Sequence, residues 1–207
     1  IARLTRELRA LGDDEDVRIV VLNARGASFC AGADLKWMKR TAEFSEAENL
    51  QDASVLAELL LVLDTLPKPT LALIQGPAYG GGIGVIAACD IAIAVRSATF
   101  SLSEVKLGLI PAVVSPYVIG AVGARQARRY FLTAERFDAQ EAYRIGLVHL
   151  IVNDEGEMRA AAERYARMFM ETAPGAVAAS KDLIASVRDK AISADLMEDT
   201  ARRIADR

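Results

Sequence analysis

The sequence is poor in histidine and cysteine, which excludes several kinds of active site. It has one histidine, His149, and two cysteines, Cys30 and Cys89, among 207 residues. A metal site built from several histidines is impossible, and His149 lies in a strand-like run, which argues against a Ser-His-Asp or Cys-His site. Both cysteines have apolar neighbours, which is typical of reduced core residues. A disulfide between them is the less favoured alternative.

The sequence also lacks an excess of basic charge and any long apolar segment. Lys and Arg number 25 and Asp and Glu 28, which leaves a net charge of −3, and there is no basic run. The electrostatic footprint of a nucleic-acid-binding protein is therefore missing. The longest apolar run is shorter than a membrane-spanning helix requires. We expect neither a nucleic-acid nor a membrane partner, and a composition of 52% hydrophobic residues predicts one globular domain.

Apolar runs of strand character alternate with helical patterns along most of the chain. We expect extended segments at 17–22, 70–74, 91–95, 99–102 and 147–152, and helices at 1–11, 35–41, 45–66, 83–89, 116–120, 124–132 and 138–146. From residue 155 onward the pattern is nearly all helical, with an interruption at Pro174 and Gly175. Apolar strands that alternate with helices predict an α/β protein whose buried strands are mostly parallel.

A glycine-rich turn lies between the expected strand at 70–74 and the expected helix at 83–89. It contains three consecutive glycines, Gly80, Gly81 and Gly82. A strand that leads through such a turn into a helix leaves the first helical N–H groups unpaired, and the helix dipole adds positive charge there. This arrangement suits either a bound phosphate or an oxyanion that forms in a transition state.

A dinucleotide site is the first interpretation of this turn. Residues 82–87 match the pattern G-x-G-x-x-A, and Glu104 is a candidate for the acidic ribose ligand. The pattern does not follow the strand directly, however, because residues 76–81 intervene, and Glu104 falls well beyond the next strand. Close helix packing explains these glycines about as well.

Two further segments carry unusual residues. The loop NARGASFCAGAD at 23–34 is a second glycine-containing turn after a strand, and LSEVKLGLIP at 102–111 places Glu104 in a largely apolar stretch. A glutamate is uncommon there unless it is paired or functional. Together with GPAYGGGIG at 76–84, in this order, these segments resemble the enoyl-CoA hydratase/isomerase family, the crotonase superfamily. The resemblance covers essentially the whole chain and leaves no role for a dinucleotide.

The resemblance implies a crotonase (ClpP/crotonase-like) fold of class α/β, a spiral of ββα units with a C-terminal helical trimerisation region. We expect residues 1–172 to form the α/β core and residues 173–207 the trimerisation region of a homotrimer or a dimer of trimers. Apolar residues such as Ile184 and Ile204 fit this packing. The family pattern also has strands before Ile1 and a final helix after Arg207, so we expect these segments to be missing from the sequence.

The resemblance also implies an oxyanion hole made of backbone groups. The N–H groups of Ala31 and Gly81 would hold the thioester oxygen of an acyl-CoA and stabilise the enolate by roughly 3–4 kcal/mol each. The loop that lines the CoA path would consist of Ala31, Gly32, Ala33, Asp34 and Leu35. No metal and no separate cofactor is expected, because the CoA thioester is itself the substrate.

Glu104 occupies the position of a catalytic glutamate in this family, where it would transfer a proton or activate water. Burial would raise the pKa of its carboxyl group toward neutrality. The structural alternative is an ion pair with Arg128 or Arg129.

One position departs from the family pattern. The second glutamate of the family comes three residues after the middle glycine, and Gly84 stands there in this sequence. Hydration by two glutamates, as usually drawn, is therefore unavailable. We hypothesise that Gly84 belongs to the substrate site and makes room for a branched or carboxylated acyl group. With the stretch PAVVSPYV at 111–118, this resembles the branch that hydrates 3-methylglutaconyl-CoA-like or isohexenylglutaconyl-CoA-like substrates in leucine and acyclic-terpene breakdown.

We therefore expect a cytoplasmic enoyl-CoA hydratase, a hydro-lyase that adds water across a 2-enoyl-CoA. One alternative is a Δ3,Δ2-enoyl-CoA isomerase, since a single carboxylate suffices to move a proton between carbons. The other is a CoA-binding protein on a crotonase fold without catalysis, which the missing second glutamate favours.

Overall fold

The computed structural model describes residues 1–34 and 43–205. Its main sheet consists of β1 (Val20–Asn23), β2 (Thr70–Ile74), β4 (Ile91–Val95) and β7 (Leu150–Val152), in the order β1-β2-β4-β7 and with every pair parallel. All residues of β2 are buried, which is the expected consequence of its place inside a parallel sheet. The expected α/β class is confirmed. The expected helix at 35–41, with Leu35, lies outside the described residues.

A smaller sheet contains β3 (Ala78–Tyr79), β5 (Thr99–Ser101) and β6 (Phe137–Asp138). Strands β3 and β5 are parallel, whereas β5 and β6 are antiparallel. The sequence analysis did not predict β3 or β6, because a strand of two residues has no periodicity. β3 matters for the site because it lies directly between the end of β2 and the glycine turn.

The strands at both edges of the main sheet are shorter than expected. The predicted strand at 17–22 begins only at Val20, which pairs with Thr70, the first residue of β2. The predicted strand at 147–152 begins only at Leu150, which pairs with Ile93. In both cases the apolar run is longer than the partner strand beside it, so its first residues lie outside the ladder of paired residues.

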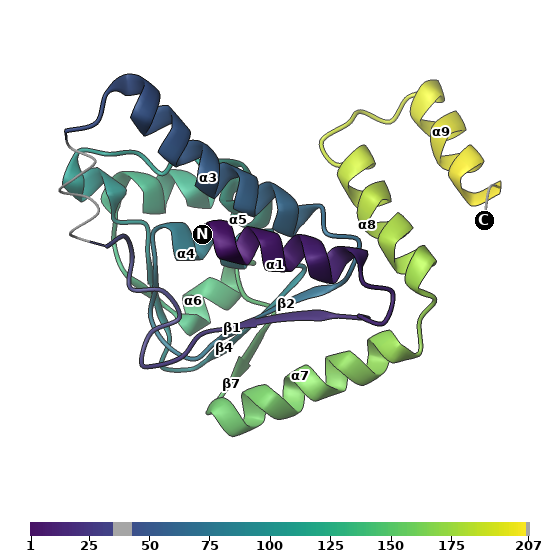
Figure 1. The fold of residues 1–207 in the computed structure, drawn as a ribbon, viewed down its shortest axis with the longest axis horizontal. Helices are drawn as coiled ribbons and strands as arrows, with labels where there is room; N and C mark the ends of the chain where they lie inside the picture. The colour runs from purple at the N-terminus through teal and green to yellow at the C-terminus, as the bar shows by residue number, and fades with distance from the viewer. Residues whose placement is uncertain (35–42, 206–207) are drawn as a thin grey trace.

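Helices make up much of the remaining described chain. They are α1 (Ala2–Asp13), α3 (Glu46–Asp64), α4 (Gly81–Ala88), the short 3₁₀ helix η1 (Glu104–Leu107), α5 (Ser115–Thr133), α6 (Ala139–Arg144), α7 (Glu155–Met170), α8 (Pro174–Val187) and α9 (Ala194–Ala205). Figure 1 shows α1 alongside α3, and α7 packs against β2, β4 and β7. None of the helices in the described residues is long and apolar enough to cross a membrane.

Local sequence signals explain where several helices begin and bend. Ser45 and Glu48 form a capping box at the start of α3, as their spacing predicts. Asp138 caps α6 by accepting a hydrogen bond from the amide of Glu141. The two helices expected at 116–120 and 124–132 form one kinked element, α5, because Gly123 adopts φ 75° and ψ 155° between them.

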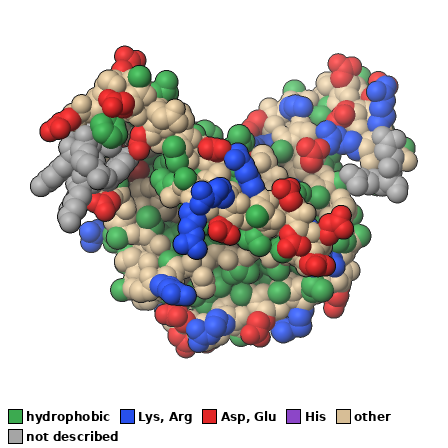
Figure 2. Space-filling model, in the orientation of Figure 1, with side chains coloured by type: hydrophobic (Ala, Val, Ile, Leu, Met, Phe, Trp, Pro, Cys, Tyr) green, Lys and Arg blue, Asp and Glu red, His purple; other side chains and the backbone are tan. Residues whose placement is uncertain are grey.

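The C-terminal helices α8 and α9 project from the body of the protein (Figures 1 and 2). Neither helix contains a buried residue. α8 is held at its base by Lys181, whose Nζ donates to Asp90 Oδ2 at 2.7 Å and to the carbonyl of Lys68 at 3.2 Å. The boundary expected near residue 173 is consistent with this arrangement and stays a prediction.

Candidate active site

The loop at 23–34 and the glycine turn meet through a short backbone bridge. Cys30 pairs in parallel with Ala78: its amide donates to the carbonyl of Pro77 at 3.1 Å, and its carbonyl accepts from the amide of Tyr79 at 2.9 Å. Ala31 follows Cys30 directly, and the first residue of α4, Gly81, comes two residues after Tyr79. The bridge therefore brings together the two segments that carry the predicted oxyanion-hole residues.

The conformation of the turn requires glycine. Gly80 has φ 53°, a left-handed backbone conformation that other residues adopt at a cost, and its amide donates to the carbonyl of Ser101 at 3.0 Å. A Cβ at Gly82 would lie only 2.4 Å from Cys30 Cβ. The first turn of α4 is thus packed directly against the loop that contains Ala31.

The amides of Ala31 and Gly81 are available for a ligand. Neither donates a hydrogen bond to any residue that the structure describes. Gly81 is the first residue of α4, where helical N–H groups have no partner within the helix. An N–H donor without an acceptor is one requirement of an oxyanion hole, and the role of these two groups stays a prediction.

A cavity of about 810 Å³ lies beside these groups. Its wall includes Gly81 and three of the residues expected to line the CoA path, Gly32, Ala33 and Asp34. The rest of the wall comes mainly from apolar residues of α1, β1, α3 and α4, among them Leu4, Leu11, Val21, Leu56, Leu59 and Val85. A largely apolar cavity with a few polar groups is typical of small-molecule sites.

Glu104 lies next to the glycine turn. It is the first residue of η1, and a Cβ at Gly80 would be 3.4 Å from its Oε1. Its Oε2 is buried and has no hydrogen-bond partner. Burial raises the pKa of the Glu104 carboxyl group above its ordinary value. A carboxyl group in this state can accept or donate a proton closer to neutral pH than an exposed glutamate can.

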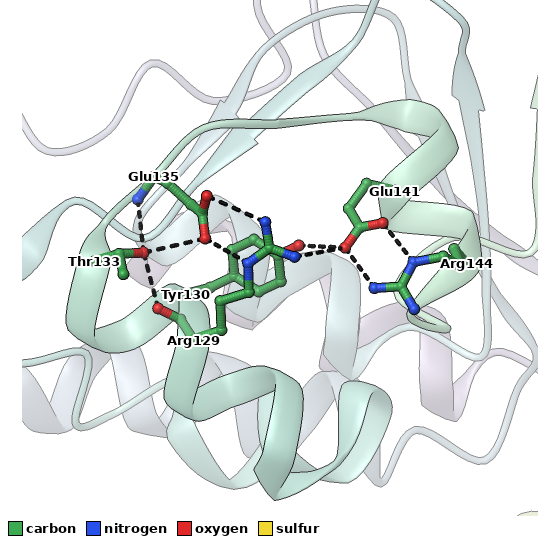
Figure 3. Close-up of polar contacts among 6 residues, drawn as sticks. All are labelled: Arg129, Tyr130, Thr133, Glu135, Glu141 and Arg144. Carbon is green, nitrogen blue, oxygen red and sulfur yellow. Dashed lines mark hydrogen bonds and ion pairs between the residues drawn. The ribbon is translucent and has the colours of Figure 1, made fainter.

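The ion pair considered as an alternative for Glu104 does not form within the described part of the chain. Arg129 instead pairs with Glu135 at 2.6 Å and with Glu141 at 3.4 Å (Figure 3). Glu141 also accepts hydrogen bonds from Arg144 and from the hydroxyl of Tyr130. This network joins α5 to α6. No salt bridge forms to Glu104 among residues 1–34 and 43–205.

The expectation of open space beside Gly84 is wrong. A Cβ there would lie 2.4 Å from Val114 Cγ1 and 3.4 Å from Leu60 Cδ1. Gly84 is buried, and its missing side chain lets α4 pack against Val114, which belongs to the PAVVSPYV segment. Any contact between Gly84 and a substrate stays a prediction.

His149 and the cysteines lie in structural positions. His149 Nδ1 accepts a hydrogen bond from the amide of Ala92 at 3.1 Å, and burial lowers its pKa. Both cysteines are free, and burial raises the pKa of the Cys89 thiol to about 12. Among the described residues, no group of three or more His, Cys, Asp or Glu residues could hold a metal ion.

Sequence reasoning missed Gln75, which follows β2 and contacts the loop at 23–34. Its Nε2 donates to the carbonyls of Gly26 and Ser28 at 3.1 and 3.0 Å. A polar residue at the carboxyl end of a buried parallel strand was the available signal, since ligand sites of α/β proteins gather at that edge.

Comparison with known proteins identifies relatives over nearly the whole chain. The sequence model of the family described as Enoyl-CoA hydratase/isomerase matches residues 1–201. The chain is 37% identical over 180 residues to a putative enoyl-CoA hydratase of Thermus thermophilus, with 86% of this chain and 71% of that protein covered. It is 33% identical over 186 residues to the mitochondrial methylglutaconyl-CoA hydratase of Homo sapiens, with 87% and 54% covered.

A solved structure to which the chain is similar belongs to the same family as the sequence relatives. The crystal structure of an enoyl-CoA hydratase from Shewanella pealeana superimposes with a TM-score of 0.95 at 46% identity, covering 98% of this chain and 75% of that one. The chain spans 60% of the length of three further curated relatives that it matches.

Proposed function

The chain belongs to the enoyl-CoA hydratase/isomerase family, and from that premise we propose that it adds water across the double bond of a 2-enoyl-CoA. The observation that carries the proposal is the carboxyl group of Glu104, whose Oε2 is buried and has no hydrogen-bond partner among the described residues, beside the turn that begins with Gly80. The bridge at Cys30 joins the two segments that carry the amides of Ala31 and Gly81, and neither amide donates a hydrogen bond within the described part of the chain.

In this mechanism the two amides bind the thioester oxygen. As water adds, negative charge moves onto that oxygen, and each N–H group stabilises it by roughly 3–4 kcal/mol. The effect needs no side chain, which agrees with the small residues at Ala31 and Gly81. The apolar cavity would exclude bulk water around the thioester and so strengthen these hydrogen bonds.

Glu104 carries the proton transfers. Its carboxylate removes a proton from the attacking water while the water oxygen forms a bond to the β-carbon of the enoyl group. The same carboxyl group then delivers that proton to the α-carbon, which completes the addition and regenerates the carboxylate. One glutamate is enough for these two proton transfers if the water and the proton add to the same face of the double bond. The absence of a second carboxylate at Gly84 therefore does not prevent hydration.

For the acyl group we favour a branched or carboxylated, glutaconyl-type chain. The support is the likeness to the human protein named methylglutaconyl-CoA hydratase. Val114 fills the space beside Gly84, so no open pocket lies there. A glutamate at position 84 would repel an anionic acyl group, whereas glycine carries no charge.

Isomerisation is the second candidate, since one carboxylate can also move a proton between two carbons of a 3-enoyl-CoA. A panel of straight-chain, branched and carboxylated enoyl-CoA thioesters separates the two reactions. Loss of the 2-enoyl absorbance indicates hydration, and its appearance from a 3-enoyl-CoA indicates isomerisation. Binding of the thioesters without either change would contradict both activities and support a CoA-binding protein without catalysis.

We also expect the protein to assemble as a homotrimer or a dimer of trimers. α8 and α9 expose several large apolar side chains, among them Ile184 at 63%, Met197 at 63% and Ile204 at 76% of their full accessible area. Isolated helices would not leave such residues in water without a partner surface. Light scattering of the intact protein tests this, and a monomer at micromolar concentration would contradict it.

A further inference from the structure

Gln75 connects the end of the central strand to the loop that holds Ala31. It follows the last residue of β2, and its Nε2 donates to the carbonyls of Gly26 at 3.1 Å and Ser28 at 3.0 Å. Both acceptors lie nearly fifty positions earlier in the chain. One side-chain amide thus fixes two points of the loop at 23–34, shortly before Ala31.

The neighbours of Gln75 hold the same loop. A Cβ at Gly76 would lie 2.1 Å from the carbonyl oxygen of Ala27, so the loop rests directly on the backbone there. The next residue, Pro77, accepts the hydrogen bond from the amide of Cys30. Three consecutive residues after β2 therefore contact the loop, and only Gln75 does so through side-chain donors.

The orientation of the Gln75 amide is determined by its partners. Nε2 faces two carbonyl oxygens, whereas Oε1 is buried without a hydrogen-bond partner. The reversed orientation would place Oε1 against two other acceptors, which is repulsive. The two hydrogen bonds that Nε2 donates offset the cost of leaving Oε1 unsatisfied. The contribution of this residue is therefore its NH₂ group.

We propose that Gln75 is a positioning residue for the oxyanion hole. Its side-chain amide holds the loop at 23–34 so that the Ala31 N–H group stays in position to bind the same oxygen as the Gly81 N–H group. The inference rests on the proposed function, in which these two amides bind the thioester oxygen. Gln75 itself does not touch the substrate. It acts by limiting the movement of one of the two donors, and displacement of a donor by about 1 Å can cost about 100-fold in rate.

Two variants and one control test the proposal. Gln75→Met keeps the length of the side chain and removes both donors, and Gln75→Glu keeps its shape but presents only acceptors when ionised. Gln140→Met changes an exposed glutamine of α6 and serves as the control. The measurements are kcat and KM with an enoyl-CoA substrate, and amide hydrogen exchange of the peptide that covers 24–34.

We expect both Gln75 variants to lose about 10–100-fold in kcat, while KM changes by about twofold or less because the cavity walls remain. Amide exchange should accelerate in 24–34 and stay unchanged in β2 and β4. Gln140→Met should match the wild type in every measurement. A merely structural role for Gln75 would instead accelerate exchange throughout the main sheet, and this outcome would overturn the proposal.

Unchanged kcat in both Gln75 variants, or a change confined to KM, would also overturn it. Failure of the proposed function gives a different pattern. In that case the wild type turns over no enoyl-CoA, and faster exchange of 24–34 in Gln75→Met still shows that Gln75 holds the loop. Unchanged exchange there would refute this holding role whether or not the protein is a hydratase.

Discussion

Replacement of Glu104 by glutamine should separate activity from stability. Glu104→Gln keeps the shape of the side chain and removes its ability to transfer protons. Acid–base groups contribute about 10²–10⁴-fold to rate, so we expect kcat to fall by at least about 100-fold. KM should change by about threefold or less, because the groups that bind the thioester are backbone amides. Steady-state kinetics with the best enoyl-CoA of the panel measure both values.

The same substitution should stabilise the protein near neutral pH. Oε2 of Glu104 is buried without a partner. A fully buried charged group in this state costs about 1–3 kcal/mol or more, and we take about 1 kcal/mol because Glu104 is only partly buried. In a protein of this size that corresponds to a rise in Tm of about 2–4 °C.

The pH dependence of this gain has a definite sign. Burial raises the pKa of Glu104 in the folded protein above 4.5, its ordinary value. Above the pKa of the folded state the carboxylate is charged in both states and lowers the stability of the folded one. As the pH falls through the folded pKa, the folded protein takes up the proton first and this penalty disappears. The advantage of Glu104→Gln should therefore be largest above the folded pKa and vanish below pH 4.5.

Glu141→Gln provides a control of opposite sign. A hydrogen bond from Arg144, and a smaller contribution from the hydrogen bond of Tyr130, lower the pKa of Glu141 to about 2 (Figure 3). This carboxylate stabilises the fold above pH 4.5, and the contribution is lost as the pH falls through about 2. The substitution should lower stability near neutral pH by about 1 kcal/mol after solvent screening. Thermal unfolding of both variants from about pH 4 to about pH 8 makes the comparison.

Two results would refute the reasoning. If Glu104→Gln retains turnover, Glu104 is not the proton-transfer group. If it lowers Tm at every pH, as Glu141→Gln should near neutral pH, its carboxylate has a partner in the folded protein, and the argument from an unpaired carboxylate fails.

Three further tests concern the oxyanion hole, the packing at Gly84 and the ion pair of Lys181. Gly81→Pro removes one N–H group at a helix position that accepts proline, and should lower kcat about 10²–10³-fold in steady-state assays; a smaller loss would exclude this amide from the oxyanion hole. Gly84→Ala should destabilise by about 1–3 kcal/mol in urea unfolding, and Val114→Ala in the same chain should recover much of that loss; additive effects would argue against the contact. Lys181→Met leaves Asp90 without its cation and should lower stability by about 1–3 kcal/mol, seen as a lower Tm, while kcat stays at the wild-type level.

Uninterrupted apolar runs determine the inner strands without help from the rest of the fold. The predictions at 70–74 and 91–95 match β2 and β4 residue for residue. Proline or glycine bounds the first run, and the second follows the cap of a helix, so local signals mark the ends. Ser45 and Asp138 mark helix starts equally well, since capping depends on residues three positions away.

These local signals could not predict which distant segments pair with each other. β3 and β6 are strands only because β5 lies beside each of them. The lengths of β1 and β7 depend on their neighbours in the main sheet, although their apolar runs are longer. The apolar pattern of a segment indicates how far it is buried. The ends of a strand depend instead on hydrogen bonds to another segment.

The sequence by itself determined which residues form the candidate site. The ordered motifs around Ala31, Gly81 and Glu104 indicate the family, and the family match agrees with them. Only the tertiary structure decided how these residues are held and what surrounds them. Val114 fills the space left by Gly84, and Gln75 binds a loop nearly fifty residues away. Such contacts depend on the packing of several elements at once, and the sequence of any one element carries no record of them.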